Sequence, residues 1–370
     1  MMPRGMLRKI WRTDWFMHST VLVLMVMGVL FIYSAGYQSE DMPVSSFYKR
    51  QMLWAIVGIA GYITMAWMDY RKLAQAAWWI YAAGLFLLVL VFVVGREAHG
   101  ATRWLSFFGM QVQPSELAKL AVILLVARYL SVPGRNTKEP RCTIKVLIMG
   151  AIPFFLVARQ PDLGTAAVLA PMVAGMLFVG GTPPKHLVVL ATLGVLMLPV
   201  AWFGLGDYQR ERIRVFMDPG RDPLGAGWNK MQSEIAVGSG GLRGKGYLKG
   251  TQNILGFLPR TVAPTDFIYS VIAEETGFAG AALTLALYAA LLATGLRAAL
   301  VARDKTGRLI AVGVTCMVFF HVFINVAMTI GLVPITGLPL PLMSYGGSFM
   351  VSMMLALGLV QSIYLRRERR

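Results

Sequence analysis

Residues 16–35 read FMHSTVLVLMVMGVLFIYSA, and no Asp, Glu, Lys or Arg interrupts them. A helix rises about 1.5 Å per residue, so a run of this length matches the roughly 30 Å hydrocarbon core of a bilayer. A cleaved signal peptide has a shorter apolar core with a small-residue cleavage site, and here further apolar runs follow. The stretch therefore predicts a retained first transmembrane helix.

Apolar runs of this kind continue along most of the chain. Hydrophobic residues make up 56% of the 370 residues and charged residues only 14%, against about 25% charged residues in an average soluble domain. This composition excludes a soluble enzyme and predicts an all-α polytopic membrane protein, a single transmembrane domain over residues 1–370. Ten spans are predicted, at about 16–35, 51–68, 75–95, 113–131, 145–160, 163–182, 186–205, 277–297, 309–332 and 346–365.

The basic residues predict the orientation of the chain. The net charge is +17, but Lys and Arg cluster between the apolar runs, as topology signals do, which argues against a nucleic-acid partner. Twenty of the 35 fall at the termini or in every second loop, so both termini are expected in the cytoplasm. These residues are Arg4, Arg8, Lys9, Arg12, Arg71, Lys72, Arg128, Arg135, Lys138, Arg141, Lys145, Lys185, Arg297, Arg303, Lys305, Arg308, Arg366, Arg367, Arg369 and Arg370.

One connection, residues 206–265 between the seventh and eighth spans, is predicted to be a large extracytoplasmic loop. It is polar, rich in glycine and too long for a simple connector. It carries nine Lys and Arg against five Asp and Glu, which runs against the positive-inside trend, although long loops can escape that trend. The loop could bind an anion such as a phosphate, or be solvated and attracted to anionic headgroups. Charge alone favours the second interpretation.

Ionisable residues inside a predicted span are costly in hydrocarbon and are functional candidates. Glu116 and Lys119 lie three residues apart near the start of the fourth span, so they share a helix face and can pair. The pair is either a self-neutralising structural element or the polar wall of an interior cavity, and the spacing favours neither. Asp162 lies in the tight turn before the sixth span, where capping of that helix is the favoured interpretation.

A helix-start signal precedes the eighth span at Pro264-Thr265-Asp266. The stretch from Asp266 to Arg297 is longer than one crossing requires, which suggests a short helix at the outer interface before the span. Asp266 is expected at its N-terminus, where the helix dipole favours the carboxylate. Such a carboxylate is either a general base or only a cap, and position alone does not separate the two.

The apolar run 334–347 is interrupted by prolines at 334, 339 and 341. Irregular backbone at membrane depth occurs only where it is buried in protein or lines a cavity, so we predict a re-entrant or cavity-lining loop. No CxxC or HExxH spacing occurs and the four histidines are scattered, which argues against a structural zinc site. No disulfide is expected from Cys142 and Cys316. A divalent cation as cofactor is left open.

Taken together, several motifs resemble the SEDS (shape, elongation, division and sporulation) family, and its elongation members more than its division members. They occur in the family's order and span nearly the whole chain. They are Arg103-Trp104-Leu105, Gln113-Pro114-Ser115-Glu116 with Lys119, Gln160-Pro161-Asp162-Leu163-Gly164-Thr165, Asp207-Tyr208-Gln209-Arg210, Asp222-Pro223-Leu224-Gly225-Ala226-Gly227, the glycine-rich run 238–246, Thr265-Asp266-Phe267 and the run 339–347.

One stretch departs from the family pattern. The family usually has Leu-Pro-Glu shortly before its Thr-Asp-Phe, whereas here Leu258-Pro259 is followed by Arg260 and the spacing to Thr265 is longer. Local substrate contacts are therefore in doubt, while Asp266 still aligns with the family's catalytic aspartate.

The resemblance implies a ten-helix peptidoglycan glycosyltransferase of the inner membrane, with its active site facing the periplasm. It would polymerise lipid II, a disaccharide-peptide on undecaprenyl diphosphate, during cell elongation. Partners would be a class B penicillin-binding protein, which supplies transpeptidation, and other membrane proteins of the elongation complex. A lipid II flippase and a non-catalytic scaffold remain open. Asp266 would be the general base of an inverting displacement, with substrate contacts expected from Arg103, Trp104, Glu116, Lys119, Asp162, Arg210, Lys245 and Ser344.

Overall fold

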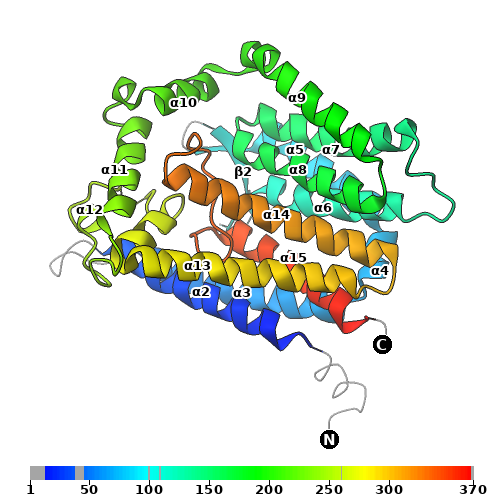
Figure 1. Cartoon of the computed structure of the whole chain (residues 1–370), viewed down its shortest axis with the longest axis horizontal. Coiled ribbons are helices and arrows are strands. Elements are labelled where there is room, and N and C mark those ends of the chain that lie inside the picture. Colours follow the sequence, from blue (N-terminus) through cyan, green and yellow to red (C-terminus); the bar gives the residue numbers. More distant parts are fainter. Residues whose placement is uncertain (1–12, 38–45, 99–100, 108–109, 260, 368–370) are drawn as a thin grey trace, which may run out of the picture.

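The computed structural model describes residues 13–37, 46–98, 101–107, 110–259 and 261–367. Long helices dominate it and lie side by side along one axis (Figure 1). Some residues of the sequence predictions lie outside the described residues. These are Arg4, Arg8, Lys9, Arg12, Arg369 and Arg370 at the termini, and Arg260 in the stretch that departs from the family pattern.

A long helix covers each predicted span. In chain order these helices are α2 (Trp15–Gly36), α3 (Phe47–Trp67), α5 (Ala77–Val94), α6 (Pro114–Leu130), α7 (Pro140–Arg159), α8 (Leu163–Gly180), α9 (Pro184–Gly204), α13 (Ile268–Leu300), α14 (Lys305–Thr329) and α15 (Gly347–Leu365), with the short α4 (Tyr70–Gln75) before α5. Within the described part of the chain, α2, α5, α7, α8, α13, α14 and α15 are long and apolar enough to cross a membrane. The prediction of a multi-pass helical membrane protein is confirmed, and the count of ten spans stays a prediction.

Burial differs strongly between the helices. The most apolar window of α15 is 83% buried and that of α14 is 67% buried, while that of α5 is only 28% buried. Outer helices instead expose large apolar side chains such as Phe86, Phe155 and Phe203. A lipid-facing surface has this apolar character because hydrocarbon, rather than water, is its solvent. The central helices therefore form the protein core, and the outer ones present apolar side chains to the bilayer.

The prediction of an all-α protein is wrong at one connection. Three antiparallel strands, β1 (Arg96–Ala98), β2 (Ala101–Phe107) and β3 (Met110–Val112), pair in the order β1-β2-β3 between α5 and α6. Leu105 is buried while the next residue, Ser106, is exposed, as the alternation of a strand requires. The strands are too short for their pattern to stand out between apolar helices.

The predicted large loop contains helices of its own. These are α10 (Asp207–Met217), the 3-10 turn η1 (Pro219–Arg221), α11 (Ala226–Ser239) and α12 (Thr251–Ile254). They arch around one end of the bundle (Figure 1). The fully buried Ser233 on α11 donates to the Thr329 carbonyl over 2.8 Å and lies 2.7 Å from the Ser270 hydroxyl. The segment is therefore docked on α13 and α14 rather than freely solvated.

A break at Gly277 divides α13. Its φ of +66° and ψ of −164° are not helical, and a Cβ added there would lie 2.3 Å from the Gly244 nitrogen. Glycine is required both for this conformation and for the close approach of the 244 backbone. The predicted short helix before the eighth span is confirmed as residues 268–276.

The segment 331–346, called the proline loop below, has irregular backbone and is deeply packed. Leu340 and Met343 are fully buried. The Tyr288 hydroxyl donates to the Pro341 carbonyl over 2.5 Å, and the Tyr345 N–H donates to the Pro264 carbonyl over 2.8 Å. The irregular backbone expected here is present, while a re-entrant or cavity-lining role stays a prediction. The Tyr345 bond fixes the loop to the residues immediately before Asp266.

Candidate functional site

Asp266 lies in the turn that leads into α13. Its N–H donates to the Val262 carbonyl over 3.0 Å, and its side chain is partly exposed. The N-cap of α13 is Phe267, which makes no side-chain capping bond. The expectation that Asp266 begins this helix is therefore wrong by one residue, and the interpretation of Asp266 as its cap is not supported. The carboxylate still lies at the positive end of the helix dipole.

A guanidinium approaches the same place from α10. A Cβ built on Gly337 would lie 3.5 Å from Asp266 Oδ2 and 3.8 Å from Arg212 Nη1, so the two charged groups flank this glycine. Arg212 donates to the Ile335 carbonyl over 2.9 Å and to the Tyr208 hydroxyl over 2.5 Å. The tyrosine ring also lies under the guanidinium, 4.7 Å from ring centre to Cζ. Arg212 is thereby held beside the proline loop.

In the sequence, Arg212 is simply one of the nine basic residues of the loop. The signal that could have identified it is its spacing of four from Tyr208, which places the two side chains on one helix face. Asn325 was missed as well. It is a fully buried amide on α14 that donates to the carbonyls of Asp266 over 3.0 Å and Leu338 over 2.7 Å. Its position as a lone amide inside an apolar run was the available signal.

Arg103 and Asp162 form a second charged group. From β2, Arg103 donates through Nε to the Gln160 carbonyl over 3.0 Å and also donates to the Pro161 carbonyl. Its Nη1 lies 3.9 Å from Asp162 Oδ1. The same oxygen accepts the Thr165 N–H over 3.2 Å, so the predicted capping of α8 by Asp162 is confirmed. Arg103 keeps 19% of its side chain exposed, which leaves it accessible from solvent.

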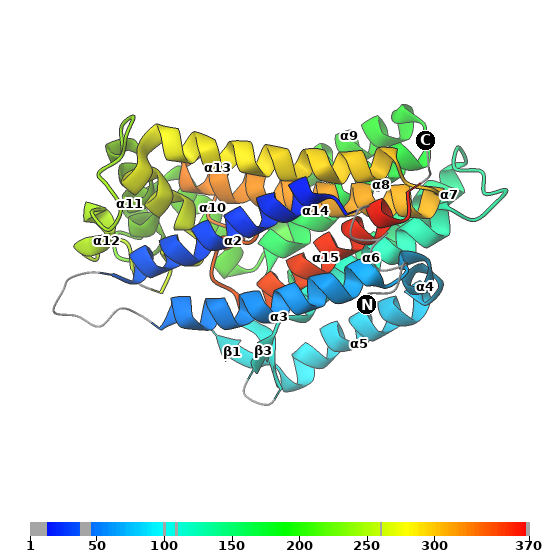
Figure 2. The same cartoon turned by 90° about the horizontal axis from the view of Figure 1, so that it is seen from below.

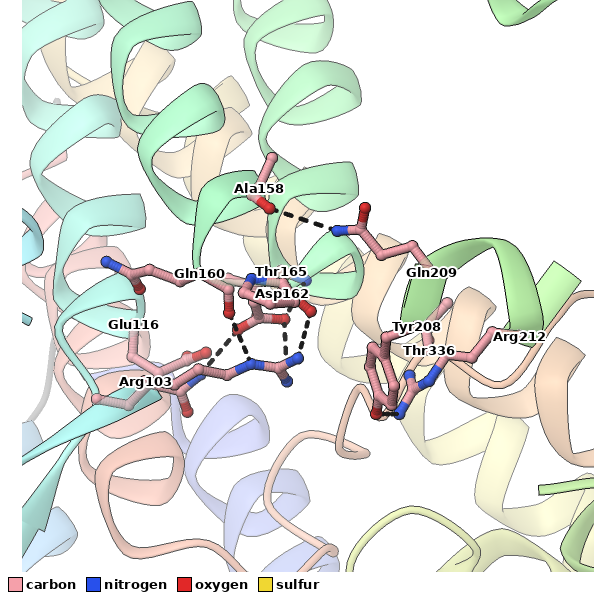
Figure 3. A network of polar contacts seen from close by, with 12 residues as sticks. Arg103, Glu116, Ala158, Gln160, Asp162, Thr165, Tyr208, Gln209, Arg212 and Thr336 are labelled. Carbon is pink, nitrogen blue, oxygen red and sulfur yellow. Dashed lines mark hydrogen bonds and ion pairs between the residues drawn. The ribbon is translucent and has the colours of Figure 1, made fainter. Parts of the chain in front are cut away.

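The two groups are linked through the proline loop. A Cβ on Gly164, in the first turn of α8, would lie 2.9 Å from the Thr336 carbonyl oxygen. Thr336 directly precedes Gly337, which Asp266 and Arg212 flank. Figure 3 shows Arg103 with Asp162 on one side and the Tyr208–Arg212 pair, with Thr336 beside it, on the other. Two arginines and two carboxylates thus gather around one short piece of irregular backbone.

Glu116 and Lys119 pair inside the bundle, as the spacing predicted. The Lys119 ammonium lies 2.9 Å from the Glu116 carboxylate and 2.7 Å from His321 Nε2 on α14. Because an ammonium can only donate, this histidine nitrogen acts as the acceptor. The Ser352 hydroxyl donates to Glu116 over 3.2 Å. Glu116 and Lys119 are at most 3% exposed, so the group lies within the core.

Ser344 and Trp104 are the remaining expected contacts near the proline loop and the sheet. Ser344 is buried, and its hydroxyl accepts the Leu340 N–H over 2.8 Å, so it closes a turn inside the loop. Trp104 is partly exposed and pairs with Arg96 in the β1–β2 register. It shares strand β2 with Arg103.

Arg210 and Lys245 make contacts in other places. Arg210 donates to the carbonyls of Trp202 over 3.1 Å and Phe203 over 2.9 Å, so it covers the end of α9. Lys245 lies 2.6 Å from the carboxylate of the buried Glu274. Both basic side chains thus hold parts of the fold together, and neither contact involves the residues that flank Gly337.

The described residues contain no cluster of three or more His, Cys, Asp or Glu side chains suited to a metal ion. Cys142 and Cys316 are both free thiols. The charged groups around Thr336 and Gly337 can instead supply a carboxylate to accept a proton and guanidinium groups to bind an anion. Arginine suits phosphate oxygens because its planar fork donates two parallel hydrogen bonds.

Comparison with known proteins identifies the family of the chain. The sequence pattern of the FtsW/RodA/SpoVE family of cell cycle proteins matches residues 14–369. The chain is 40% identical over 351 residues to peptidoglycan glycosyltransferase MrdB of Escherichia coli, covering 94% of this chain and 92% of that one.

Two solved structures share the fold. One comes from work on the structural coordination of polymerization and crosslinking by a peptidoglycan synthase complex, with a TM-score of 0.79, 32% identity, and 95% and 97% of the two chains covered. The other is the rod shape determining protein RodA of Thermus thermophilus, with a TM-score of 0.72, 31% identity, and 97% and 98% covered. The chain therefore belongs to the FtsW/RodA/SpoVE family.

Proposed function

We propose that this protein is a peptidoglycan glycosyltransferase that polymerises lipid II at the outer face of the inner membrane during cell elongation. The observation that carries the proposal is the meeting of Asp266 and Arg212 at Gly337. It occurs in a chain whose 40% identical relative is named a peptidoglycan glycosyltransferase. Transfer of a sugar from a diphosphate requires a base that accepts a proton and a cation that binds the leaving diphosphate. Asp266 and Arg212 supply these two groups.

Asp266 is the general base of this reaction. Its carboxylate takes the proton from a sugar hydroxyl of the acceptor while that oxygen attacks the anomeric carbon of the donor. The bond from the anomeric carbon to the diphosphate oxygen breaks in the same step, and the diphosphate leaves with the bonding electrons. One displacement inverts the anomeric centre, so a covalent sugar–enzyme intermediate is not formed.

The guanidinium groups stabilise the leaving diphosphate. Arg212 already points at the proline loop through its bond to the Ile335 carbonyl, and Arg103 is held by the turn before α8. Fixed cations placed where charge develops lower the barrier without reorganising during the reaction. The buried Glu116–Lys119 pair supports this region from within the core through α6.

The proposed topology has ten spans, cytoplasmic termini and the segment 206–265 outside. Support comes from the distribution of the basic turns. The α4 segment, the turn between α13 and α14 and the end of α15 lie at one end of the bundle, and α10 to α12 lie at the other (Figures 1 and 2). Lys and Arg are enriched in cytoplasmic loops. Asp266 and Arg212 belong to the end that would face the periplasm.

The proposed partner is a class B penicillin-binding protein that crosslinks the new glycan, together with other membrane proteins of the elongation complex. The structural neighbour supports this, because it comes from a peptidoglycan synthase complex that coordinates polymerization and crosslinking. Membrane helices such as α9, with its exposed apolar side chains, provide surface for contacts within the bilayer.

The test is a polymerisation assay with purified protein and lipid II, with and without the transpeptidase partner. Glycan polymer supports the proposal. A lipid II flippase would move substrate across proteoliposomes without forming polymer, and a scaffold would do neither. The assay separates these three functions by product rather than by binding, which all three share.

A further inference from the structure

A cavity of about 610 Å³ that is open to the surface lies where α8 turns into α9. Its lining includes Lys138, Phe178, Thr182 and Lys185. The turn joins two apolar helices, so it lies at a membrane–water boundary. It belongs to the end of the bundle that carries α4, opposite the end that carries α10 to α12 (Figure 1).

The cavity is lined by hydrogen-bond donors that the protein itself does not use. Thr182 is 3% exposed, and its hydroxyl has no hydrogen-bond partner among the described residues. A buried hydroxyl without a partner is unfavourable unless something else occupies its site. Lys138 and Lys185 make no ion pair within the described part of the chain. The residues that line this cavity therefore carry two ammonium groups and one buried, unpartnered hydroxyl.

The backbone of residues 182–184 offers no free N–H group to a ligand in the cavity. Pro183 and Pro184 follow Thr182 directly, and proline has no N–H. The Thr182 N–H is already bonded to the Leu177 carbonyl over 3.1 Å. A ligand in the cavity must therefore be bound by side-chain donors. These groups match the oxygens of a phosphate.

The neighbouring carboxylate of Glu139 does not reverse the preference of the cavity for a phosphate. Glu139 follows Lys138 in the chain, is exposed, and accepts the side-chain N–H of Asn136 over 3.0 Å. The Thr137 hydroxyl donates to the Gly181 carbonyl over 3.3 Å, which holds the segment carrying Lys138 against the α8–α9 turn. The two lysines thus approach the cavity from two elements that are fixed to each other.

Apolar surface continues from the cavity along the helices. Phe178, on its wall, is 61% exposed, and Val188 and Val189, one turn into α9, are 63% and 56% exposed. A soluble anion gains nothing from such a surface, whereas the acyl chains of a lipid cover it. Basic pockets between membrane helices bind anionic headgroups in this way.

We propose that this cavity binds the phosphate of an anionic phospholipid, held by Lys138, Lys185 and the Thr182 hydroxyl, with its acyl chains along Phe178 and α9. The site is independent of the proposed glycosyltransferase activity. A bound lipid would brace the α8–α9 turn, from which α9 extends with little other packing.

The experiment counts phospholipid bound to the purified full chain by native mass spectrometry, titrating phosphatidylglycerol against phosphatidylcholine. The variants are Lys138→Gln with Lys185→Gln, and separately Thr182→Val, which keeps the side-chain volume. The matched control is Lys72→Gln, an exposed lysine on α4 at the same end of the bundle. Inorganic phosphate is added as competitor in a parallel series.

The parent is expected to retain phosphatidylglycerol over phosphatidylcholine, and the double variant to lose more than about tenfold in affinity, since each lysine contributes roughly fivefold near an anionic surface. Thr182→Val is expected to weaken binding, and Lys72→Gln to leave it unchanged. Equal retention by the parent and the double variant overturns the proposal, as does an equal loss in the control. Displacement by millimolar inorganic phosphate overturns the lipid assignment in favour of a soluble anion. Because lipid is counted without any polymerisation, a negative result here leaves the proposed activity separately testable.

Discussion

Asn325 donates a side-chain N–H to the main-chain carbonyl of Asp266 over 3.0 Å. The same amide donates to the Leu338 carbonyl over 2.7 Å. One buried side chain on α14 therefore ties the turn that carries the proposed base to the proline loop. Because the bond is made to the backbone of Asp266, it positions the residue without using its carboxylate.

The first prediction concerns this tether. Asn325→Leu keeps the volume but removes both donors, leaving two carbonyls without their partner at a cost of about 1–3 kcal/mol each. We expect a clear fall in the rate of polymerisation with a smaller change in lipid II affinity, together with a lower melting temperature. Asn136→Ala, at an exposed amide whose side chain bonds to Glu139 and to the Lys138 N–H rather than to the turn of Asp266, is the control and should leave the rate of polymerisation unchanged. A parental rate in Asn325→Leu would show that the tether does not position Asp266.

The second prediction concerns the buried pair on α6. Removing one partner of a buried ion pair typically costs about 3–5 kcal/mol, because it strands the other charge. Glu116→Ala and Lys119→Ala should each lower the yield of folded protein, and the double variant should regain part of it. In Glu116→Ala, the polar and ring partners that Lys119 keeps among the described residues are His321 and the Phe349 ring, 5.7 Å from its nitrogen. If every variant folds like the parent but loses activity, the pair acts on substrate rather than on structure.

The third prediction concerns pH and the turn before α14. Burial acts to raise the pKa of the Asp304 carboxyl, but hydrogen bonds from the Gly307 N–H, Arg71 and Tyr70 outweigh it, and the pKa lies below its usual value. A lowered carboxyl pKa means that the ionised form stabilises the fold. That contribution is complete above the unfolded pKa of about 4 and is lost as pH falls through the lower folded value.

Asp304→Asn should therefore lower the melting temperature at pH 7 by a margin that narrows only below about pH 4. Asp207→Asn, at a fully exposed carboxylate, should show little margin at any pH. Melting curves in detergent at several pH values measure both. A margin for Asp304→Asn that vanishes already at pH 6 would contradict the lowered pKa.

The fourth prediction concerns topology. Lys305 and Lys249 are both exposed, and they lie at opposite ends of the bundle. Single cysteines at these positions, in a chain with Cys142 and Cys316 replaced, report the side of the membrane through an impermeant thiol reagent on intact cells. Position 249 should be labelled and position 305 protected until the cells are opened. The reverse labelling pattern would contradict the proposed topology and, with it, the proposed mechanism.

The helices were predictable because each apolar run is long and bounded by polar residues. The first predicted span, 16–35, became Trp15–Gly36. The paired Glu116 and Lys119 were also predictable, since i and i+3 fix a shared face. The capping role of Asp162 follows from a local rule of the same kind.

What could not be predicted depends on contacts between distant segments. The placement of Arg212 beside Asp266 requires α10 to pack against the proline loop. No local sequence pattern predicts that contact. Arg210 and Lys245 were expected at the substrate because they are basic and belong to family motifs, yet their side chains bind the end of α9 and the buried Glu274. Charge identifies candidates, but only packing shows which of them are already occupied.

The most direct test of the account is lipid II polymerisation by purified Asp266→Asn. Asparagine has nearly the same size but cannot accept a proton at neutral pH, and loss of a general base costs about 10²–10⁴-fold in rate. Folding should hardly change, because the N-cap of α13 is Phe267 and Asn325 bonds to the backbone of residue 266. Partner co-purification and melting temperature are measured alongside, with Glu211→Gln, an exposed carboxylate on α10, as the matched control.

The account predicts that Asp266→Asn remains folded and partner-bound and makes at least about a hundredfold less polymer, while Glu211→Gln polymerises like the parent. A well-folded Asp266→Asn that polymerises lipid II at a near-parental rate would contradict the assignment of Asp266 as the general base.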